Sequence, residues 1–457
     1  MAVIEFASTA HGVCTRLLAR GRHWLTDRAD TALAQRVAST AFLIRVVSAV
    51  FAYVAQIALA RWMGRFEFGI YAYVWTWVML IGGAVDLGLA SASQRFIPEY
   101  AERGAAAHVR GYIYGSRWIV FGVASVVSIL CALAIRLLEP KLDDYMIVPL
   151  YLACAMLPIF GVMQMQDGIA RSYNWMNVAL LPSYVVRQML LIAFVALAYL
   201  GGIVVDARLA VAAACLSLWL TGIGQLLLLN RKLNAAHPNR ECSYEPGRWI
   251  SISLPMFVVD SLYLLLLYVD VIVLKQFSSP QDIAVYYAAV KTLALVSFVH
   301  FSVGAATAHK YTEYHVAGDR EKLTRFLADS IKWTFWPSLA AAALILICGW
   351  PLLWLFGESF VSGYKLMFIL SIGILARAAI GPGERFLNML GEQRACMVVA
   401  GGAFLVNLVL CLLLIPPYGT TGAAISASCA FLVESALLFI VAKRRLGFHL
   451  FAWRGKE

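Results

Sequence analysis

A small set of ionisable side chains lies inside long apolar stretches of this sequence, where a lipid bilayer disfavours charge. On insertion scales a charged group at the centre of a span costs about 2.5–3.5 kcal/mol, so it normally faces an opposite charge or a water-filled cavity. Basic side chains in such a cavity could bind an anion, and acidic ones could bind a proton or Na⁺. The basic candidates are Arg45, Arg187, Lys291 and Arg377, and the acidic candidates for ion coupling are Asp260, Asp270 and Glu434.

The basic candidates differ in how strongly their positions indicate a cavity. Arg187 lies about 12 Å from the nearer end of its apolar stretch, and Lys291 is similarly deep, so we expect both to face a lumen. Arg45 either shares this lumen or extends to the membrane surface. For Arg377 the alternative is a pairing with Glu384 two turns away or with a neighbouring helix. A lumenal Arg45 is favoured by the small or polar residues on its helical face, Ser48, Ala52 and Gln56.

The acidic candidates also have structural alternatives. Asp260 follows Pro255 by five residues, so a freed carbonyl and the carboxylate could together hold a proton or cation; otherwise it neutralises Lys291 or Arg377. Asp270 suits a helix cap or an acceptor of a hydrogen bond between spans. Glu434 shares a face with small residues and could pack against them. Asp86 and Asp167 lie toward span ends, where they could simply fix the depth of the helix.

Composition predicts an all-α polytopic membrane protein. The sequence is 61% hydrophobic and 14% charged, with a mean hydropathy of +0.76, and a soluble fold could not bury this much apolar surface. Breaks are expected at Pro158 and at Gly381–Gly383, where the helices of two spans would be interrupted. We predict twelve transmembrane helices in two pseudo-symmetric six-helix lobes, at 39–60, 70–92, 113–138, 147–170, 179–200, 208–230, 249–274, 283–308, 329–350, 361–384, 395–415 and 420–442.

Most of the 37 Lys and Arg residues fall on one side of these spans, which places both termini in the cytoplasm. The net charge of +11 therefore requires no nucleic-acid partner. The predicted units are a cytoplasmic basic N-terminal segment (1–38), an N-terminal lobe (39–230), a cytoplasmic linker (231–248), a C-terminal lobe (249–442) and a cytoplasmic basic tail (443–457). The basic residues expected in the opposite loops are Arg61, Arg65, Arg136, Lys141, Arg208, Lys275 and Lys365.

The two lobes are weakly similar in sequence. Ile57–Tyr100 aligns with Val273–Tyr314, and such internal repeats are typical of transporters whose substrate path lies between the repeats. His300 is half a turn out of phase with Lys291, so the two cannot line one cavity on an ideal helix. An aromatic cluster at one end of the second span suggests residues of the membrane–water interface, namely Tyr71, Tyr73, Trp75 and Trp77.

Several classes of function are disfavoured. The nine cysteines show no CxxC pair and no metal-ligand spacing, so we expect no metal and no cofactor. The sequence lacks a phosphate-binding loop and the common hydrolase motifs, and the loops opposite the termini are short. We therefore expect a secondary transporter rather than an enzyme such as a membrane glycosyltransferase or polymerase. Four buried cations predict a cavity that attracts an anion, and a lipid-linked sugar diphosphate fits better than the cation of a multidrug antiporter.

The sequence resembles the Wzx-type polysaccharide flippases of the multidrug/oligosaccharidyl-lipid/polysaccharide (MOP) exporter superfamily. The similarity lies in Phe386–Arg394 followed by Asn407–Ser426, and in Asp86–Leu89 followed by Arg95–Tyr100. Cys411 departs from the pattern, because many members carry Asn there. The motifs are structural, so they indicate family and fold more than substrate.

The resemblance implies a flippase with two lobes around a cationic cavity. It would move an undecaprenyl-diphosphate-linked oligosaccharide across the bacterial inner membrane for O-antigen, capsule or exopolysaccharide synthesis. H⁺ and Na⁺ are the candidate coupling ions. A polysaccharide polymerase and a chain-length regulator are candidate protein partners. The alternatives within the superfamily are a multidrug or cation antiporter and a flippase for the peptidoglycan lipid precursor.

Overall fold

The computed structural model describes residues 30–236 and 241–451, and within these ranges it is built of helices without strands. Most of the predicted N-terminal segment therefore lies outside the described residues. The N-terminal half contains α2 (Asp30–Ala84), α3 (Leu89–Glu102), α4 (Ala106–Leu138), α5 (Asp144–Ser172), α6 (Met176–Leu180), α7 (Arg187–Leu200) and α8 (Ala207–Ala236). The C-terminal half contains α9 (Pro246–Phe277), α10 (Pro280–Leu293), α11 (Ser297–Val316), α12 (Arg320–Ile347), α13 (Gly349–Trp354), α14 (Tyr364–Ala379), α15 (Gly383–Met389) and α16 (Gln393–Val441).

The chain is a multi-pass membrane protein. Ten helices in the described ranges are long and apolar enough to cross a membrane. Two of them are too long for one crossing, since the 55 residues of α2 would extend about 80 Å. Each is broken at a glycine with positive φ, Gly64 in α2 and Gly419 in α16, a conformation that glycine adopts without strain. Both breaks fall between spans that the sequence predicts as separate; the total of twelve spans stays a prediction.

Of the two expected helix breaks, one occurs. The break expected at Pro158 is wrong, because α5 continues through this proline from Asp144 to Ser172; transmembrane helices tolerate proline where neighbouring groups satisfy the freed carbonyl. The break at Gly381–Gly383 is confirmed, since α14 ends at Ala379 and α15 begins at Gly383. Gly381 has φ +60°, and a Cβ atom there would lie 2.8 Å from the Cα atom of Ile331.

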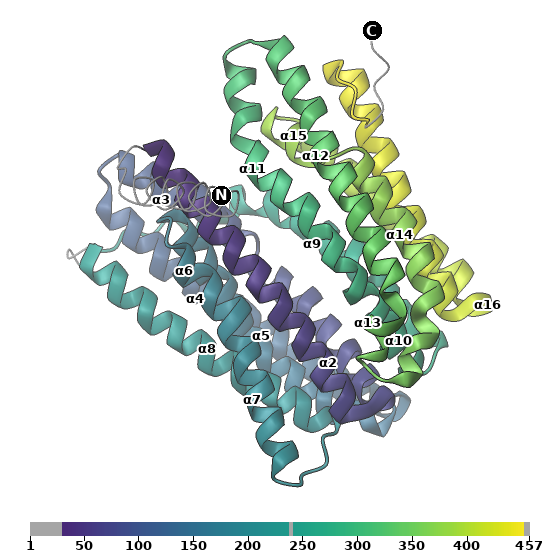
Figure 1. Ribbon diagram of the computed structural model, residues 1–457. Coiled ribbons are helices and arrows are strands. Elements are labelled where there is room, and N and C mark those ends of the chain that lie inside the picture. Colours follow the sequence, from purple (N-terminus) through teal and green to yellow (C-terminus); the bar gives the residue numbers. More distant parts are fainter. Residues whose placement is uncertain (1–29, 237–240, 452–457) are drawn as a thin grey trace, which may run out of the picture.

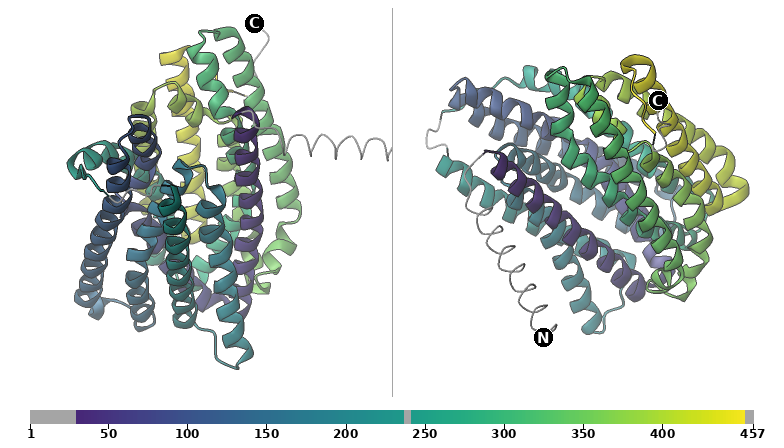
Figure 2. Two further views of the ribbon diagram at one scale, coloured as in Figure 1. Left: turned by 90° about the vertical axis from the view of Figure 1, so that its left-hand side faces the viewer. Right: turned by 45° about the horizontal axis from the view of Figure 1, so that its top comes forward.

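The helices form two groups that lie side by side. In Figure 1 the N-terminal half, purple to teal, is on the left and the C-terminal half, green to yellow, is on the right; Figure 2 gives two further directions. The linker joins them beside α3, where Arg248 pairs with Glu99 at 2.6 Å and Tyr100 donates to Glu245 at 2.7 Å. The Tyr100 hydroxyl and the Arg248 guanidinium hold the pKa of Glu245 below its ordinary value. These contacts fix the start of α9 against the first half.

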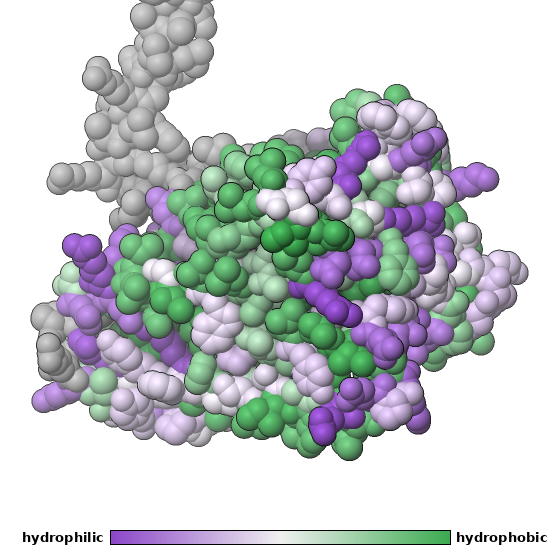
Figure 3. All heavy atoms as spheres, turned by 90° about the horizontal axis from the view of Figure 1, so that it is seen from below, coloured by the Kyte–Doolittle hydropathy of each residue, from purple (hydrophilic) through white to green (hydrophobic). Residues whose placement is uncertain are grey.

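The two halves are joined tightly at the end of the molecule that contains Gly64. Arg61 donates from Nε to the Leu355 carbonyl at 2.7 Å and from Nη2 to the Trp354 carbonyl at 2.6 Å. Arg65 donates to the Gln281 carbonyl at 2.9 Å. Figure 3, which views the molecule from below in Figure 1, shows hydrophilic side chains distributed among hydrophobic ones over this end. Arginine hydrogen bonds to backbone carbonyls thus hold the halves together here.

Gly69 permits a close approach of α2 to α10, and its substitution tests this contact. A Cβ atom at Gly69 would lie 1.8 Å from the carbonyl oxygen of Pro280, which begins α10. We expect Gly69→Ala to lower the free energy of unfolding by about 1–3 kcal/mol, because α2 and α10 must move apart. Thermal unfolding in detergent measures this. Gly122→Ala in α4 is the control, because nothing lies within 4 Å of its Cβ position; equal melting temperatures for the two variants would contradict the contact.

Candidate functional site

Arg45 lies between the two halves, against aromatic rings from both. Its guanidinium carbon is 4.2 Å from the ring centroid of Phe301 on α11 and 5.3 Å from that of Tyr184. Cations over aromatic faces gain about 0.5–2 kcal/mol, but an aromatic ring does not neutralise the charge. Of the two alternatives for Arg45, the contact with Phe301 favours the position between the halves.

Arg187 is positioned by an irregular turn. Residues Leu181–Val186 form a π-helical turn before α7, and such turns are common at functional sites. Arg187 begins α7, donates from Nε to the Ser183 carbonyl at 3.1 Å, and stacks over Trp75 with 4.8 Å between the guanidinium carbon and the ring centroid. The interface position suggested for Trp75 is wrong, because only 9% of it is exposed and its ring meets Arg187. Tyr71 and Tyr73 are buried as well.

Lys291 approaches the same region from the C-terminal half. It lies in the last turn of α10, with Nζ 4.8 Å from the ring centroid of Tyr287. The two tyrosines connect the three cations, since Tyr184 interacts electrostatically with both Arg45 and Arg187, and Tyr287 interacts with Arg187. Across the described part of the chain, none of the three cations has a carboxylate within 4.0 Å. The structure thus groups three of the four predicted cations without an ion-pair partner, although Asp167 lies near enough to act electrostatically on Arg45 and Arg187, and Asp270 on Lys291.

Arg377, the fourth candidate, lies apart from this group. Its Nε atom is 3.3 Å from Oε2 of Glu434, whose side chain is 1% exposed. Glu384 is on α15 and Arg377 on α14, so the two do not pair within one helix. Glu384 acts on Arg377 electrostatically, without an ion pair between them in the described residues. Glu434 also accepts a hydrogen bond from Tyr263 at 3.1 Å, so it is a charge partner rather than a residue packed only on small neighbours. Pairing with a neighbouring helix was the open alternative for Arg377, and it is the one observed.

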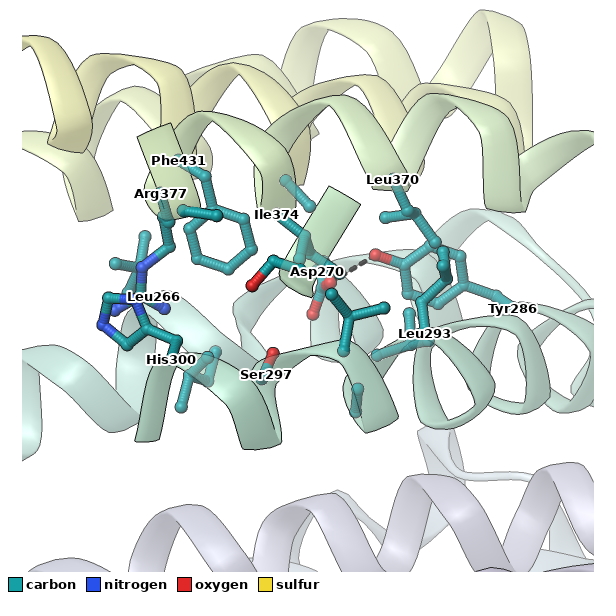
Figure 4. A pocket seen from close by; sticks show the side chains of 17 residues that line it. Leu266, Asp270, Tyr286, Leu293, Ser297, His300, Leu370, Ile374, Arg377 and Phe431 are labelled. Carbon is teal, nitrogen blue, oxygen red and sulfur yellow. Dashed lines mark hydrogen bonds between the residues drawn. The ribbon is translucent and has the colours of Figure 1, made fainter. Parts of the chain in front are cut away.

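Arg377 borders a cavity of about 150 Å³ inside the C-terminal half. Figure 4 shows Arg377 and His300 at one end of it, Tyr286 toward the other, and Asp270 between them. Asp270 accepts a hydrogen bond from the Tyr286 hydroxyl, which links α9 to α10 as expected for an acceptor between spans. His300 lines this cavity and Lys291 lines a different one, so the prediction that they do not share a cavity is confirmed.

Asp260 faces a third cavity, of about 300 Å³, between the two halves. Asp86 and Asp167 from the N-terminal half line the same cavity. Asp260 accepts a hydrogen bond from the Ser91 hydroxyl of α3 at 3.1 Å, and within the described ranges it forms no ion pair with Lys291 or Arg377, so the neutralising role is wrong. Sequence reasoning missed this grouping, since Asp86, in the turn between α2 and α3, Asp167 and Asp260 come from segments far apart in the chain.

The cavity lined by Lys291, which we call the interlobe pocket, lies between α2, α7 and α10 and has a volume of about 200 Å³. Lys291 lines it, together with two aromatic residues. These are Trp75, whose ring faces Arg187, and Tyr287, whose ring faces Lys291. It also contains two amide side chains, Gln56 and Gln188. The polar face of the first span pointed to Gln56, whereas no sequence signal distinguished Gln188 or Tyr287. In the ranges that the structure describes, no three His, Cys, Asp or Glu side chains gather to hold a metal ion.

Comparisons with known proteins agree with this architecture. A family model described as "Polysaccharide biosynthesis protein" matches residues 35–308, and the MatE model matches residues 255–413. No curated protein matches the chain.

Three solved structures have a similar fold at 16% sequence identity. An inward-facing multidrug resistance MATE transporter of the MOP superfamily superposes with a TM-score of 0.70, over 89% of this chain and 98% of that one. The lipid II flippase MurJ, in an inward closed conformation, also gives 0.70, over 88% and 87%. A MOP superfamily transporter from Pyrococcus furiosus, described as having a binding pocket of reverse polarity, gives 0.67, over 91% and 96%. At this identity the likeness establishes the two-lobed helical fold.

Proposed function

The chain belongs to the polysaccharide biosynthesis protein family of the MOP exporter superfamily, and we propose that it is a flippase for an undecaprenyl-diphosphate-linked oligosaccharide. The observation that carries this proposal is the group formed by Arg45, Arg187 and Lys291. These cations lie between the two halves of a membrane protein, against aromatic rings, and none of them forms an ion pair with a carboxylate of the described residues. We propose the bacterial inner membrane as its location, with both termini in the cytoplasm.

The charge balance favours a multivalent anion as cargo. Two unit charges 4 Å apart attract by about 4 kcal/mol at an effective dielectric constant of 20. This exceeds the roughly 2.5–3.5 kcal/mol that burial of one cation costs. A diphosphate bound among these three side chains would therefore offset the cost of burying them, while its polyprenyl chain stays in the lipid. An organic cation would be repelled from the same region.

Transport requires the binding region to open alternately to the two sides of the membrane. The contacts of Arg61 and Arg65 close the Gly64 end, which the distribution of basic residues assigns to the outside. In our proposal, cargo enters from the cytoplasm, and its binding shifts the population toward a state in which these contacts are broken. The two halves would then separate at the Gly64 end and release the lipid-linked sugar into the outer leaflet.

We propose Asp260 as the residue that couples this motion to a proton or sodium gradient. Its carboxylate meets Ser91 of the other half across the lobe interface and shares a cavity with Asp86 and Asp167. Binding of H⁺ or Na⁺ there would lower the repulsion among the three carboxylates as the halves approach. Asp270 and Glu434 are weaker candidates, because each is already engaged by a tyrosine, and Glu434 also by Arg377.

The acidic cavity also favours a second candidate function, the export of an organic cation in exchange for H⁺ or Na⁺. Three carboxylates border it, and Arg171 is the basic residue among its lining side chains. The MatE match to residues 255–413 and the fold of the multidrug transporter agree with either cargo. A cation would use the Asp260 cavity, whereas the lipid diphosphate would use the region of Arg187 and Lys291, so the two functions predict different sensitive residues.

Neutralising the central cations tests the flippase proposal. Arg187→Ala and Lys291→Ala should each lower the export of surface polysaccharide roughly tenfold or more, because a charge-assisted hydrogen bond contributes about 1.5–3 kcal/mol. Export is measured in cells that depend on this protein, with its membrane level followed by immunoblot. Arg136→Ala is the matched control, since it removes one exposed positive charge at the end of α4. Export at the wild-type rate by both lumenal variants would show that the cationic group does not handle the cargo.

Neutralising Asp260 tests the coupling proposal. In proteoliposomes, Asp260→Asn should transport at a rate that no longer responds to an imposed proton or sodium gradient, because the residue can no longer gain and lose the ion. Asp329→Asn, at an exposed position on α12, should respond as the wild type does. If Asp260→Asn keeps the full response to the gradient, the carboxylate has a structural role.

A further inference from the structure

The interlobe pocket contains two buried hydrogen-bond acceptors that lack donors. Gln56 on α2 and Gln188 on α7 are each 8% exposed, and the Oε1 atom of each has no hydrogen-bond partner among the described residues. Leaving a buried acceptor unsatisfied costs about 1–3 kcal/mol, so such groups usually have a role beyond stability. Two of them in one cavity indicate a ligand, absent from the structure, that brings its own donors.

The rest of the lining restricts the chemistry of this ligand. Lys291 supplies N–H donors and a positive charge. Trp75 and Tyr287 supply apolar lining, although Arg187 and Tyr71 stack on Trp75 and Lys291 lies over Tyr287. A polyprenyl or acyl chain would leave both glutamine oxygens unsatisfied. An organic cation would be repelled by the positive charge of Lys291. A sugar ring suits the polar groups of this lining, because its hydroxyls can donate to both amide oxygens and accept from Lys291.

The size and place of the pocket determine which sugar of the cargo it would take. Its volume of about 200 Å³ is below the roughly 300–1,000 Å³ of pockets for drug-sized ligands, so it accommodates one ring rather than an oligosaccharide. Arg187 stacks on Trp75 and Lys291 faces Tyr287, so both cations flank the pocket. A diphosphate held by these cations would place the sugar bonded to it nearest to Gln56 and Gln188.

We propose that the interlobe pocket binds the sugar ring attached directly to the diphosphate, with Gln56 and Gln188 as the groups that recognise its hydroxyls. This inference rests on the proposed flippase function and adds to it a site of sugar recognition. Two halves contribute to the pocket, α2 and α7 from one and α10 from the other. The ring would therefore be held only while the halves are close at this level.

Binding of defined lipids to the purified protein tests this site. The probes are undecaprenyl diphosphate alone and the same lipid carrying one glucose, galactose or N-acetylglucosamine, with dissociation constants measured in nanodiscs. We expect the wild type to bind at least one glycosylated lipid fivefold or more tightly than the bare lipid. Gln56→Leu and Gln188→Leu should each reduce this preference to less than twofold without weakening binding of the bare lipid. Lys291→Ala should weaken binding of all the probes.

The variants also separate recognition from a structural role. Because the glutamine oxygens are unsatisfied, replacing either amide by leucine should leave the melting temperature unchanged or raised. Equal affinity of the wild type for all four lipids, or a preserved preference in both leucine variants, overturns the sugar site while leaving the flippase proposal in place. Failure of the wild type to bind any of the four lipids, bare undecaprenyl diphosphate included, overturns both.

Discussion

The burial of positive charge without direct ion pairs between two apolar halves is the constraint on which the rest of the structure depends. Arg45, Arg187 and Lys291 meet aromatic rings instead of carboxylates, and these contacts stabilise the cations without cancelling their field. By contrast, Arg377 is neutralised by Glu434 inside the C-terminal half. The distinction separates three cations available to a ligand from one that holds α14 to α16.

Negative charge is arranged in a complementary way. Asp86, Asp167 and Asp260 border a separate cavity between the halves, and Asp260 reaches Ser91 across the interface. Segregation of the two signs of charge into different cavities would let one region hold an anionic cargo while the other responds to a coupling ion. At the Gly64 end, Arg61 donates to two backbone carbonyls and stacks over Trp354, and it pairs with no carboxylate of the described residues. Its contacts can therefore form and break without leaving a buried carboxylate unpaired.

Features set by local sequence were predictable, and those set by contacts between distant helices were not. Hydropathy and glycine positions predicted the spans and the break at Gly381, because each depends on residues within one segment. The continuity of α5 through Pro158 and the pairing of Arg377 with Glu434 depend on neighbouring helices. Tryptophan is common at membrane–water interfaces, so the sequence suggested that position for Trp75. Only the fold shows that its ring lies against Arg187. The cationic candidates were predictable because a bilayer penalises charge wherever it occurs.

The most direct test of the flippase account is transbilayer movement of a labelled undecaprenyl-diphosphate oligosaccharide in proteoliposomes of the wild-type protein. A fluorescent organic cation is followed in parallel, with and without a proton or sodium gradient. The account predicts that the lipid-linked sugar crosses the membrane and the cation does not. Movement of the cation without the lipid would contradict it and would assign transport to the cavity of Asp86, Asp167 and Asp260.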